Sequence, residues 1–186
     1  LRVVMPHSVA DARDMLIASV LCSDPVIYID DRWLYEKEDE LPPITEMKIE
    51  DFTPKIIKSG DHITLVGSSY STQMALDASN SLEDLGIFSE VIDIRTINPF
   101  QPDNIIDSVR KTRNLIVIDG GTRTSSFATE VITSVVEKIN PHNLDNKPMR
   151  ITLPNSPAPT SRKLEDYYYP TVSEIIESAK TLLRKD

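Results

Sequence analysis

Three histidines are the side chains best suited to acid–base chemistry in this chain, because an imidazole titrates near neutral pH. His7 follows Pro6 at the end of a β-branched run, and α/β proteins place ligands at the carboxyl ends of strands. His7 is therefore the strongest functional candidate of the three, although we favour a loop or helix-capping role for it. His62 precedes a strand and His142 lies in a polar turn, so we expect both at the surface.

A second candidate is the segment Asp119–Thr124, which follows an apolar strand and precedes a helical pattern. Its backbone N–H groups and the guanidinium of Arg123 could bind an anion. We favour the alternative that Gly120 and Gly121 form a turn and that Arg123 contacts another subunit.

Two further groups of side chains have structural interpretations. Asp93 and Arg95 flank Ile94 at the end of a strand, where we expect an ion pair or a loop tether. The run Tyr167–Tyr169 is dense for a chain with 6% aromatic residues. We expect it to pack against the last helix or a neighbouring subunit rather than to bind a ligand.

Several motifs of known chemistry are missing from the sequence. The five glycines are not spaced as a dinucleotide fingerprint or a phosphate-binding loop, and no Gly-x-Ser-x-Gly elbow occurs. Cys22 is the single cysteine, so neither a disulfide framework nor a cysteine zinc site is available. These patterns identify no catalytic and no cofactor-binding residue in the chain.

Composition narrows the class of protein further. The 186 residues include 29 acidic and 20 basic side chains, a formal charge of −9, which argues against binding nucleic acid or an anionic membrane surface. The apolar content of 40% is ordinary for a folded α/β protein, and no apolar run reaches the roughly 18 residues of a membrane span. A lone cysteine fits a reducing compartment, and we expect a cytoplasmic location.

The candidate residues are positioned by apolar runs that alternate with helical patterns, which is typical of a mostly parallel sheet covered by helices. Strands are predicted over 63–66, 90–94, 115–118 and 149–152, and helices over 72–85, 102–112, 125–139 and 172–183. Gly86 ends the first of these helices and is predicted to take a positive φ. We therefore interpret residues 61–186 as one complete three-layer α/β/α domain.

The N-terminal part has a different organisation. It is predicted to contain a strand, a helix capped by Ser8 and a second strand, over 2–5, 9–21 and 26–29. This unit is too small to bury both of its faces, and we assign residues 1–35 to the end of another domain. Residues 36–60 are charged, punctuated by proline and aperiodic, which predicts a linker. Because the chain opens at Leu1 within a strand, we interpret it as the back part of a longer protein.

The order of these motifs resembles the C-terminal part of the beta subunit of thiamine-diphosphate-dependent 2-oxo acid dehydrogenases, of the pyruvate and branched-chain type, in the transketolase superfamily. The most specific match is Val91–Pro99, which reads Val-Ile-Asp-Ile-Arg-Thr-Ile-Asn-Pro. The other matching segments are 1–6, 11–12, 24–27, 60–66, 112–117, Glu130, 157–159 and 164–170. The resemblance implies a transketolase C-terminal domain preceded by the last strand–helix–strand of a pyrimidine-binding domain.

The resemblance also implies a reaction, the oxidative decarboxylation of a 2-oxo acid with acyl transfer to the lipoyl arm of an acyltransferase core. Thiamine diphosphate and Mg²⁺ would lie between an alpha subunit and the pyrimidine-binding domain, and the family's catalytic residues would lie upstream of Leu1. This chain would then be a scaffold and assembly part that alone is inactive and does not bind the cofactor. The alternatives are a subunit of a two-chain transketolase or related carboligase, and a non-catalytic assembly module.

Two local sites follow from the resemblance. A K⁺ ion is implied at the end of the first helix, on oxygen atoms of Ser19, Val20, Cys22 and Asp24. The alternative is that this segment is only a turn that closes the helix. Asp145 matches an acidic residue near the docking position of the acyltransferase, and its alternative is an exposed loop acid. We expect the protein to form a homo- or hetero-oligomer.

Overall fold

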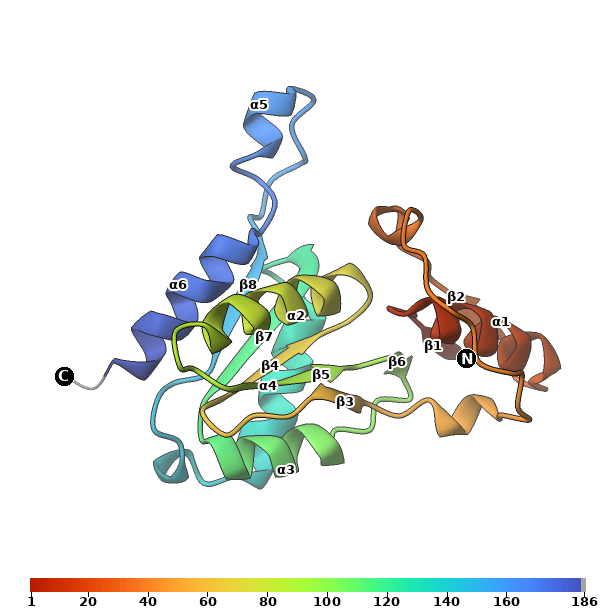
Figure 1. Ribbon diagram of the computed structural model, residues 1–186, viewed down its shortest axis with the longest axis horizontal. Coiled ribbons are helices and arrows are strands. Elements are labelled where there is room, and N and C mark those ends of the chain that lie inside the picture. Colours follow the sequence, from red (N-terminus) through yellow and green to blue (C-terminus); the bar gives the residue numbers. More distant parts are fainter. Residues whose placement is uncertain (185–186) are drawn as a thin grey trace.

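The computed structural model describes residues 1–184 and consists of a small N-terminal unit beside a larger α/β domain (Figure 1). In the small unit, β1 (Arg2–Val4) pairs in parallel with β2 (Val26–Tyr28), and α1 (Val9–Leu21) connects them. Ser8 caps α1, because its hydroxyl oxygen accepts a hydrogen bond from the backbone N–H of Asp11 at 3.0 Å. The predicted strand–helix–strand unit is confirmed.

The larger domain is built on a five-stranded sheet with the order β3-β5-β4-β7-β8. The strands are β3 (Lys55–Lys58), β4 (Ile63–Gly67), β5 (Ser89–Asp93), β7 (Leu115–Thr122) and β8 (Met149–Leu153). All neighbouring pairs are parallel except β3 with β5, which is antiparallel. The four central and C-terminal strands are the four that the apolar runs predict.

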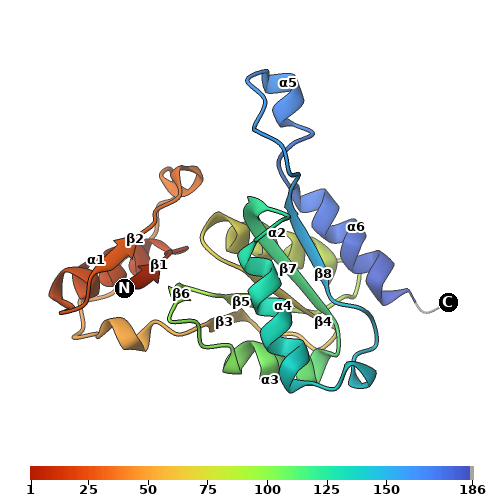
Figure 2. The ribbon, with the colours of Figure 1, turned by 180° about the vertical axis from the view of Figure 1, so that it is seen from behind.

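Helices cover both faces of this sheet, as the views from the two sides show (Figures 1 and 2). On one face lie α2 (Tyr70–Glu83) and α6 (Val172–Leu183), and on the other lie α3 (Asp103–Thr112) and α4 (Phe127–Lys138). Each face has its own apolar core, because the strands bury both sides. The expected three-layer α/β/α fold is confirmed, and Gly86 has the predicted positive φ of 76°.

The segment between the two parts differs from its prediction at its end. Residues 55–58 were expected in a linker over 36–60, but they form β3 at the edge of the main sheet. The four residues alternate poorly in polarity, with a lysine at each end, which is common on edge strands and hides them from pattern analysis. Residues 29–54, which we call the connection, run from the end of β2 to β3 and contain two short 3-10 turns, η1 (Arg32–Leu34) and η2 (Ile49–Asp51).

A short strand that sequence patterns assign to a turn joins the two parts. β6 (Thr96–Asn98) follows β5 but leaves the main sheet and pairs antiparallel with β1. The N-terminal unit therefore contributes two strands to a three-stranded sheet of order β2-β1-β6, whose third strand comes from the larger domain. The carboxyl ends of β1 and β5 face each other as a result.

The remaining elements are short. They are η3 (Pro141–Asn143), before β8, and α5 (Arg162–Glu165), which lies on an arm that projects away from the sheet (Figure 1). Across residues 1–184, the helices are too short or too polar to cross a lipid bilayer.

We predict that Gly60→Ala destabilises the fold, because an added Cβ would lie less than 3.0 Å from backbone atoms of Phe88 and Ser89. Backbone cannot move aside as a flexible side chain does, so we expect a loss of about 2 kcal/mol or more in the free energy of unfolding. Gly120→Ala is the control, since nothing lies within 4 Å of its added Cβ. Urea unfolding of the two variants checks this, and equal midpoints would contradict it.

Candidate functional site

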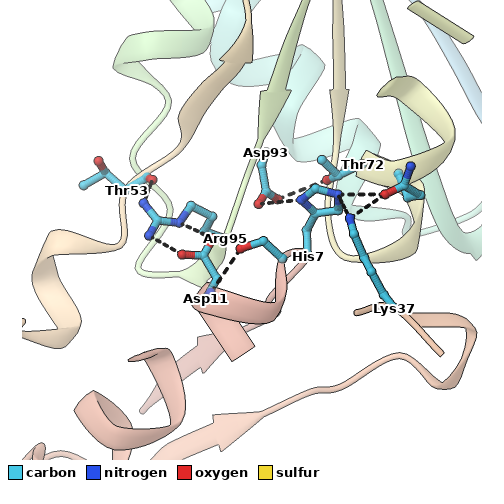
Figure 3. Close-up of polar contacts among 9 residues, drawn as sticks. His7, Asp11, Lys37, Thr53, Thr72, Asp93 and Arg95 are labelled. Carbon is cyan, nitrogen blue, oxygen red and sulfur yellow. Dashed lines mark hydrogen bonds and ion pairs between the residues drawn. The ribbon is translucent and has the colours of Figure 1, made fainter. Parts of the chain in front are cut away.

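Seven polar side chains meet where the N-terminal unit contacts the larger domain, and we call this group the joint cluster (Figure 3). They come from the end of β1 and the start of α1, from the segment after η1, from α2 and from the end of β5. The members are His7, Asp11, Lys37, Thr72, Gln73, Asp93 and Arg95.

An ion pair between Arg95 and Asp11 crosses the joint. Arg95 Nη2 and Nε donate to the two carboxylate oxygens of Asp11, at 2.8 and 3.1 Å. The side chains are only 8% and 15% exposed, so the pair is shielded from solvent. Arg95 also lies over the ring of Phe52, with its Cζ 4.7 Å from the centroid, and donates to the carbonyl oxygen of Thr53 at 3.4 Å. One guanidinium thus binds α1, the connection and the end of β5 together.

Asp93, two residues earlier, is the most deeply buried acid of the cluster, with 1% of its surface exposed. Its Oδ1 accepts a hydrogen bond from the Thr72 hydroxyl at 3.0 Å, while its Oδ2 is buried without a hydrogen-bond partner among the described residues. Burial raises the pKa of Asp93 to about 7, against the lowering effect of the Thr72 hydrogen bond. The sequence predicted an ion pair or tether at Asp93 and Arg95; the structure pairs Arg95 with Asp11 and leaves Asp93 facing His7.

His7 fills the space between Asp93 and the N-terminal unit and is 7% exposed. Its Nε2 lies 3.3 Å from Lys37 Nζ, which also donates to Gln73 Oε1 at 2.7 Å. The same Nε2 lies 3.3 Å from Gln73 Oε1, so accepting from Lys37 and donating to Gln73 require opposite tautomers of the ring, while Nδ1 lies 3.8 Å from Asp93 Oδ2. Burial, aided by the charge of Lys37, lowers the pKa of His7. Since burial favours the neutral forms of both His7 and Asp93, the two form a polar contact rather than an ion pair.

A cavity of about 230 Å³ opens beside the cluster, at the carboxyl ends of the parallel strands β1 and β2. His7 and Lys37 line it together with Tyr28, Asp30 and Tyr35. The Tyr28 hydroxyl donates to the carbonyl oxygen of Ala12 at 2.8 Å, and burial raises the pKa of Tyr28 to about 12. The cavity offers groups of both charges, so it can hold a small polar ligand.

The predicted K⁺ residues lie at the C-terminal end of α1. No basic residue occupies the last turn of α1, so its terminal carbonyl groups remain suited to a cation. The carboxylate of Asp24, however, accepts a hydrogen bond from Arg2 Nε at 2.8 Å and already has a cationic partner. The K⁺ site on Ser19, Val20, Cys22 and Asp24 stays a prediction.

The two predicted partner residues, Asp145 and Arg123, lie near opposite ends of β7. Arg113 precedes β7, and Asp145, from the loop before β8, forms an exposed ion pair with it at 2.8 Å. Arg123 follows the strand and lines a groove of about 450 Å³ with Arg150. Between them, the carboxylate of Asp119 accepts hydrogen bonds from the N–H groups of Gly121 and Ala128, at 2.8 and 2.9 Å. The N–H groups of Gly121 and Ala128 are thereby satisfied within the fold.

Sequence reasoning missed part of the joint cluster. Lys37 lies in a charged run that indicates a solvated loop, yet it is half-buried against His7. Thr72 and Gln73 lie on a helix without any motif that marks them. The one member of the cluster that the sequence did mark was Asp11, which lies in a segment of the family resemblance. Its partner Arg95 is 84 residues away, so the sequence did not indicate the pairing. His62 and His142 are exposed as predicted.

Comparison with known families gives one match, to the family described as "Transketolase, C-terminal domain", over residues 53–175. The chain is 32% identical to the pyruvate dehydrogenase E1 component subunit beta of Rhizobium meliloti, covering 100% of this chain and 40% of that protein. It is 31% identical to the 2-oxoisovalerate dehydrogenase subunit beta of Dictyostelium discoideum (97% and 48%). It is 33% identical to the acetoin:2,6-dichlorophenolindophenol oxidoreductase subunit beta of Bacillus subtilis (98% and 53%). The chain thus spans about half the length of these curated relatives.

Solved structures agree on the fold. A split-gene transketolase, described as an inactive beta4 tetramer, superposes with a TM-score of 0.74 at 20% identity, over 98% of this chain and 58% of that one. A transketolase from Pichia stipitis superposes with a TM-score of 0.59 at 12% identity, over 98% and 25%.

We predict that Asp11→Asn loosens the joint. The substitution keeps the side-chain shape but leaves the buried guanidinium of Arg95 without a counter-charge, which costs about 3–5 kcal/mol in comparable buried pairs. We expect faster proteolysis between residues 36 and 54. Asp107→Asn is the control, because its ion pair with Arg110 is exposed. Equal cleavage rates in the two variants would refute the role of this pair.

We predict a pH dependence that originates at Asp93. The carboxyl group keeps its proton up to a pH of about 7 in the folded protein but only to 3.8 as a free side chain. The folded state therefore binds more protons between these values, and the free energy of unfolding falls as the pH rises through them, by at most about 1.4 kcal/mol per pH unit. In Asp93→Asn this contribution is absent. Denaturant unfolding from about pH 5 to about pH 8 should give a flatter curve for the variant than for the wild type, and parallel curves would contradict the assignment.

Proposed function

The chain belongs to the transketolase C-terminal domain family, and on that basis we propose that it is the C-terminal part of a beta subunit of a thiamine-diphosphate-dependent 2-oxo acid dehydrogenase. The observation that carries the proposal is the similarity to beta subunits of such enzymes along the full chain, at 31–32% identity. The joint cluster supports it, because His7, Asp11 and Arg95 fix the N-terminal unit against the family domain. The role proposed is that of a scaffold and assembly part.

The N-terminal unit has an exposed apolar surface. Val20 and Leu21 are each 77% exposed at the end of α1, and Ile27 and Ile29 on and after β2 are also exposed. β2 is an edge strand whose outer side is free to pair, and exposed apolar patches of this kind mark contact surfaces. We propose that other strands of a pyrimidine-binding domain, together with an alpha subunit, cover this surface in the parent complex.

The cofactors of the proposed parent enzyme are thiamine diphosphate and Mg²⁺, with K⁺ at the end of α1. Thiamine diphosphate, when bound, supplies the carbanion chemistry that decarboxylates a 2-oxo acid. In the segment Asp119–Thr124, the N–H groups of Gly121, Arg123 and Thr124 already donate within the fold. We therefore propose that the diphosphate binds to the alpha subunit. The acyl group would pass to the lipoyl arm of an acyltransferase core that docks near Asp145. Arg123 would lie at a subunit contact. We propose a cytoplasmic location for the complex.

We predict that the purified chain does not bind thiamine diphosphate and Mg²⁺ and that it forms a dimer or larger species. Calorimetric titration, with the mass in solution determined alongside, checks both points. Micromolar binding would overturn the proposal, because the cofactor contacts would then lie within these residues. A mass in solution equal to that of a single chain would contradict the assembly role.

The assay of the complete enzyme decides between the proposed activity and its alternatives. The acetoin oxidoreductase subunit is as similar to the chain as the dehydrogenase subunits are, so identity alone does not select the substrate. The parent protein with its alpha partner should reduce lipoamide in the presence of a 2-oxo acid. Transfer of a ketol group between sugar phosphates would instead indicate a two-chain transketolase. If both activities were absent, the non-catalytic assembly module would be the interpretation that remains.

A further inference from the structure

A second cavity, of about 210 Å³, lies at the carboxyl edge of the main sheet and has an aromatic lining. Trp33 of η1, Tyr70 at the start of α2 and Tyr169 on the arm after α5 contribute three rings. The η1 segment and the arm project toward the same side of the molecule (Figures 1 and 2). The volume is below the roughly 300–1,000 Å³ of pockets for drug-sized molecules, so the cavity suits a small group.

The three rings are held in a fixed arrangement. Trp33 stacks on Tyr70 with ring centroids 5.2 Å apart, and the Tyr169 ring lies 6.0 Å from Trp33 at a tilted angle. The Asp31 carboxylate accepts a hydrogen bond from the backbone N–H of Trp33 at 3.1 Å and so caps the turn that carries the indole. Tyr169 packs edge-on against Tyr168 at 5.0 Å. Yet Trp33 remains 64% exposed, so this aromatic group is not a closed core.

The electrostatic character of this cavity is negative. Asp31 lines this cavity as well as the one beside the joint cluster, and only one of its oxygen atoms is used by the backbone N–H of Trp33. The pKa of Tyr70 is raised, mainly by burial and further by the nearby charges of Asp77 and Asp31. Among the described lining residues none is basic. An anion would be repelled here, whereas a cation would meet both a carboxylate and ring faces.

We propose that this cavity binds an alkylammonium group, the head of a small quaternary amine or the side chain of a lysine. Aromatic rings attract such cations through their quadrupoles, most strongly tryptophan, and a nearby carboxylate adds Coulombic attraction. A neutral apolar group of the same size would leave Asp31 facing it without compensation. The proposal is independent of the proposed function, because it involves neither thiamine diphosphate nor the joint cluster.

Trp33 is the single tryptophan of the chain, so its fluorescence reports on this cavity alone. We expect choline to change that fluorescence in a saturable way and to bind about tenfold more tightly than dimethylbutanol, its uncharged isostere. Saturation-transfer NMR on the choline methyl protons gives an independent measure. Tighter binding of choline than of capped lysine assigns the site to a small amine, and the reverse order assigns it to a protein lysine.

Two variants test the lining. Tyr169→Leu should weaken choline binding about fivefold or more, and Asp31→Asn should weaken it and reduce its dependence on salt, while keeping an oxygen for the Trp33 N–H. Tyr167→Leu is the matched control, because Tyr167 is 90% exposed, two residues away, and does not line the cavity. Equal binding of choline and dimethylbutanol, or equal binding by Tyr169→Leu and Tyr167→Leu, would overturn the proposal.

Discussion

The placement of the two parts of this protein depends on one buried charge, the guanidinium of Arg95. A guanidinium cannot lose its proton, so when the fold removes it from water it must find an anion with matching geometry. Asp11 supplies that anion from the first turn of α1, and Phe52 supplies a ring face from the connection. Because the pair is bidentate, it restricts the orientation of the N-terminal unit as well as its distance.

The polar contacts around that pair follow from the same geometry. β5 ends at Asp93 and Arg95 comes two residues later, so the end of this strand places a carboxyl group and a guanidinium at the same joint. Asp11 takes Arg95, and Asp93 is left to Thr72 and His7. Asp93 therefore has no bonded counter-charge; burial raises its pKa, while burial and the charge of Lys37 lower the pKa of His7. The joint combines one permanent ion pair with a neighbouring group that changes protonation near neutral pH.

The architecture of the larger domain leaves few of its surfaces open to partners. Both faces of its sheet are occupied by helices, so the surfaces left for partners are the strand ends, the edges and the small N-terminal unit. Both cavities at carboxyl strand ends use residues from the connection, 30–37, which reaches across from one part to the other. The exposed apolar residues lie on the unit whose sheet is still open at β2. The same connection thus shapes both cavities, and the unit beside it carries exposed apolar residues.

The sequence by itself determined the layers of the larger domain, its four main helices and four of the five strands of its sheet, but not the edge strand β3. Runs such as 115–118 are apolar enough to be buried on both faces, and Gly86 marks a helix end by a backbone conformation that other residues avoid. It also marked His7, Asp93 and Arg95 as residues at strand ends. Only the tertiary structure decided that β6 leaves its sheet to pair with β1, that Arg95 chooses Asp11 over Asp93, and that Lys37 is half-buried. The physical reason is that periodicity reports which side chains of one segment are buried. A pairing across 84 positions depends instead on where two distant parts of the chain meet in space.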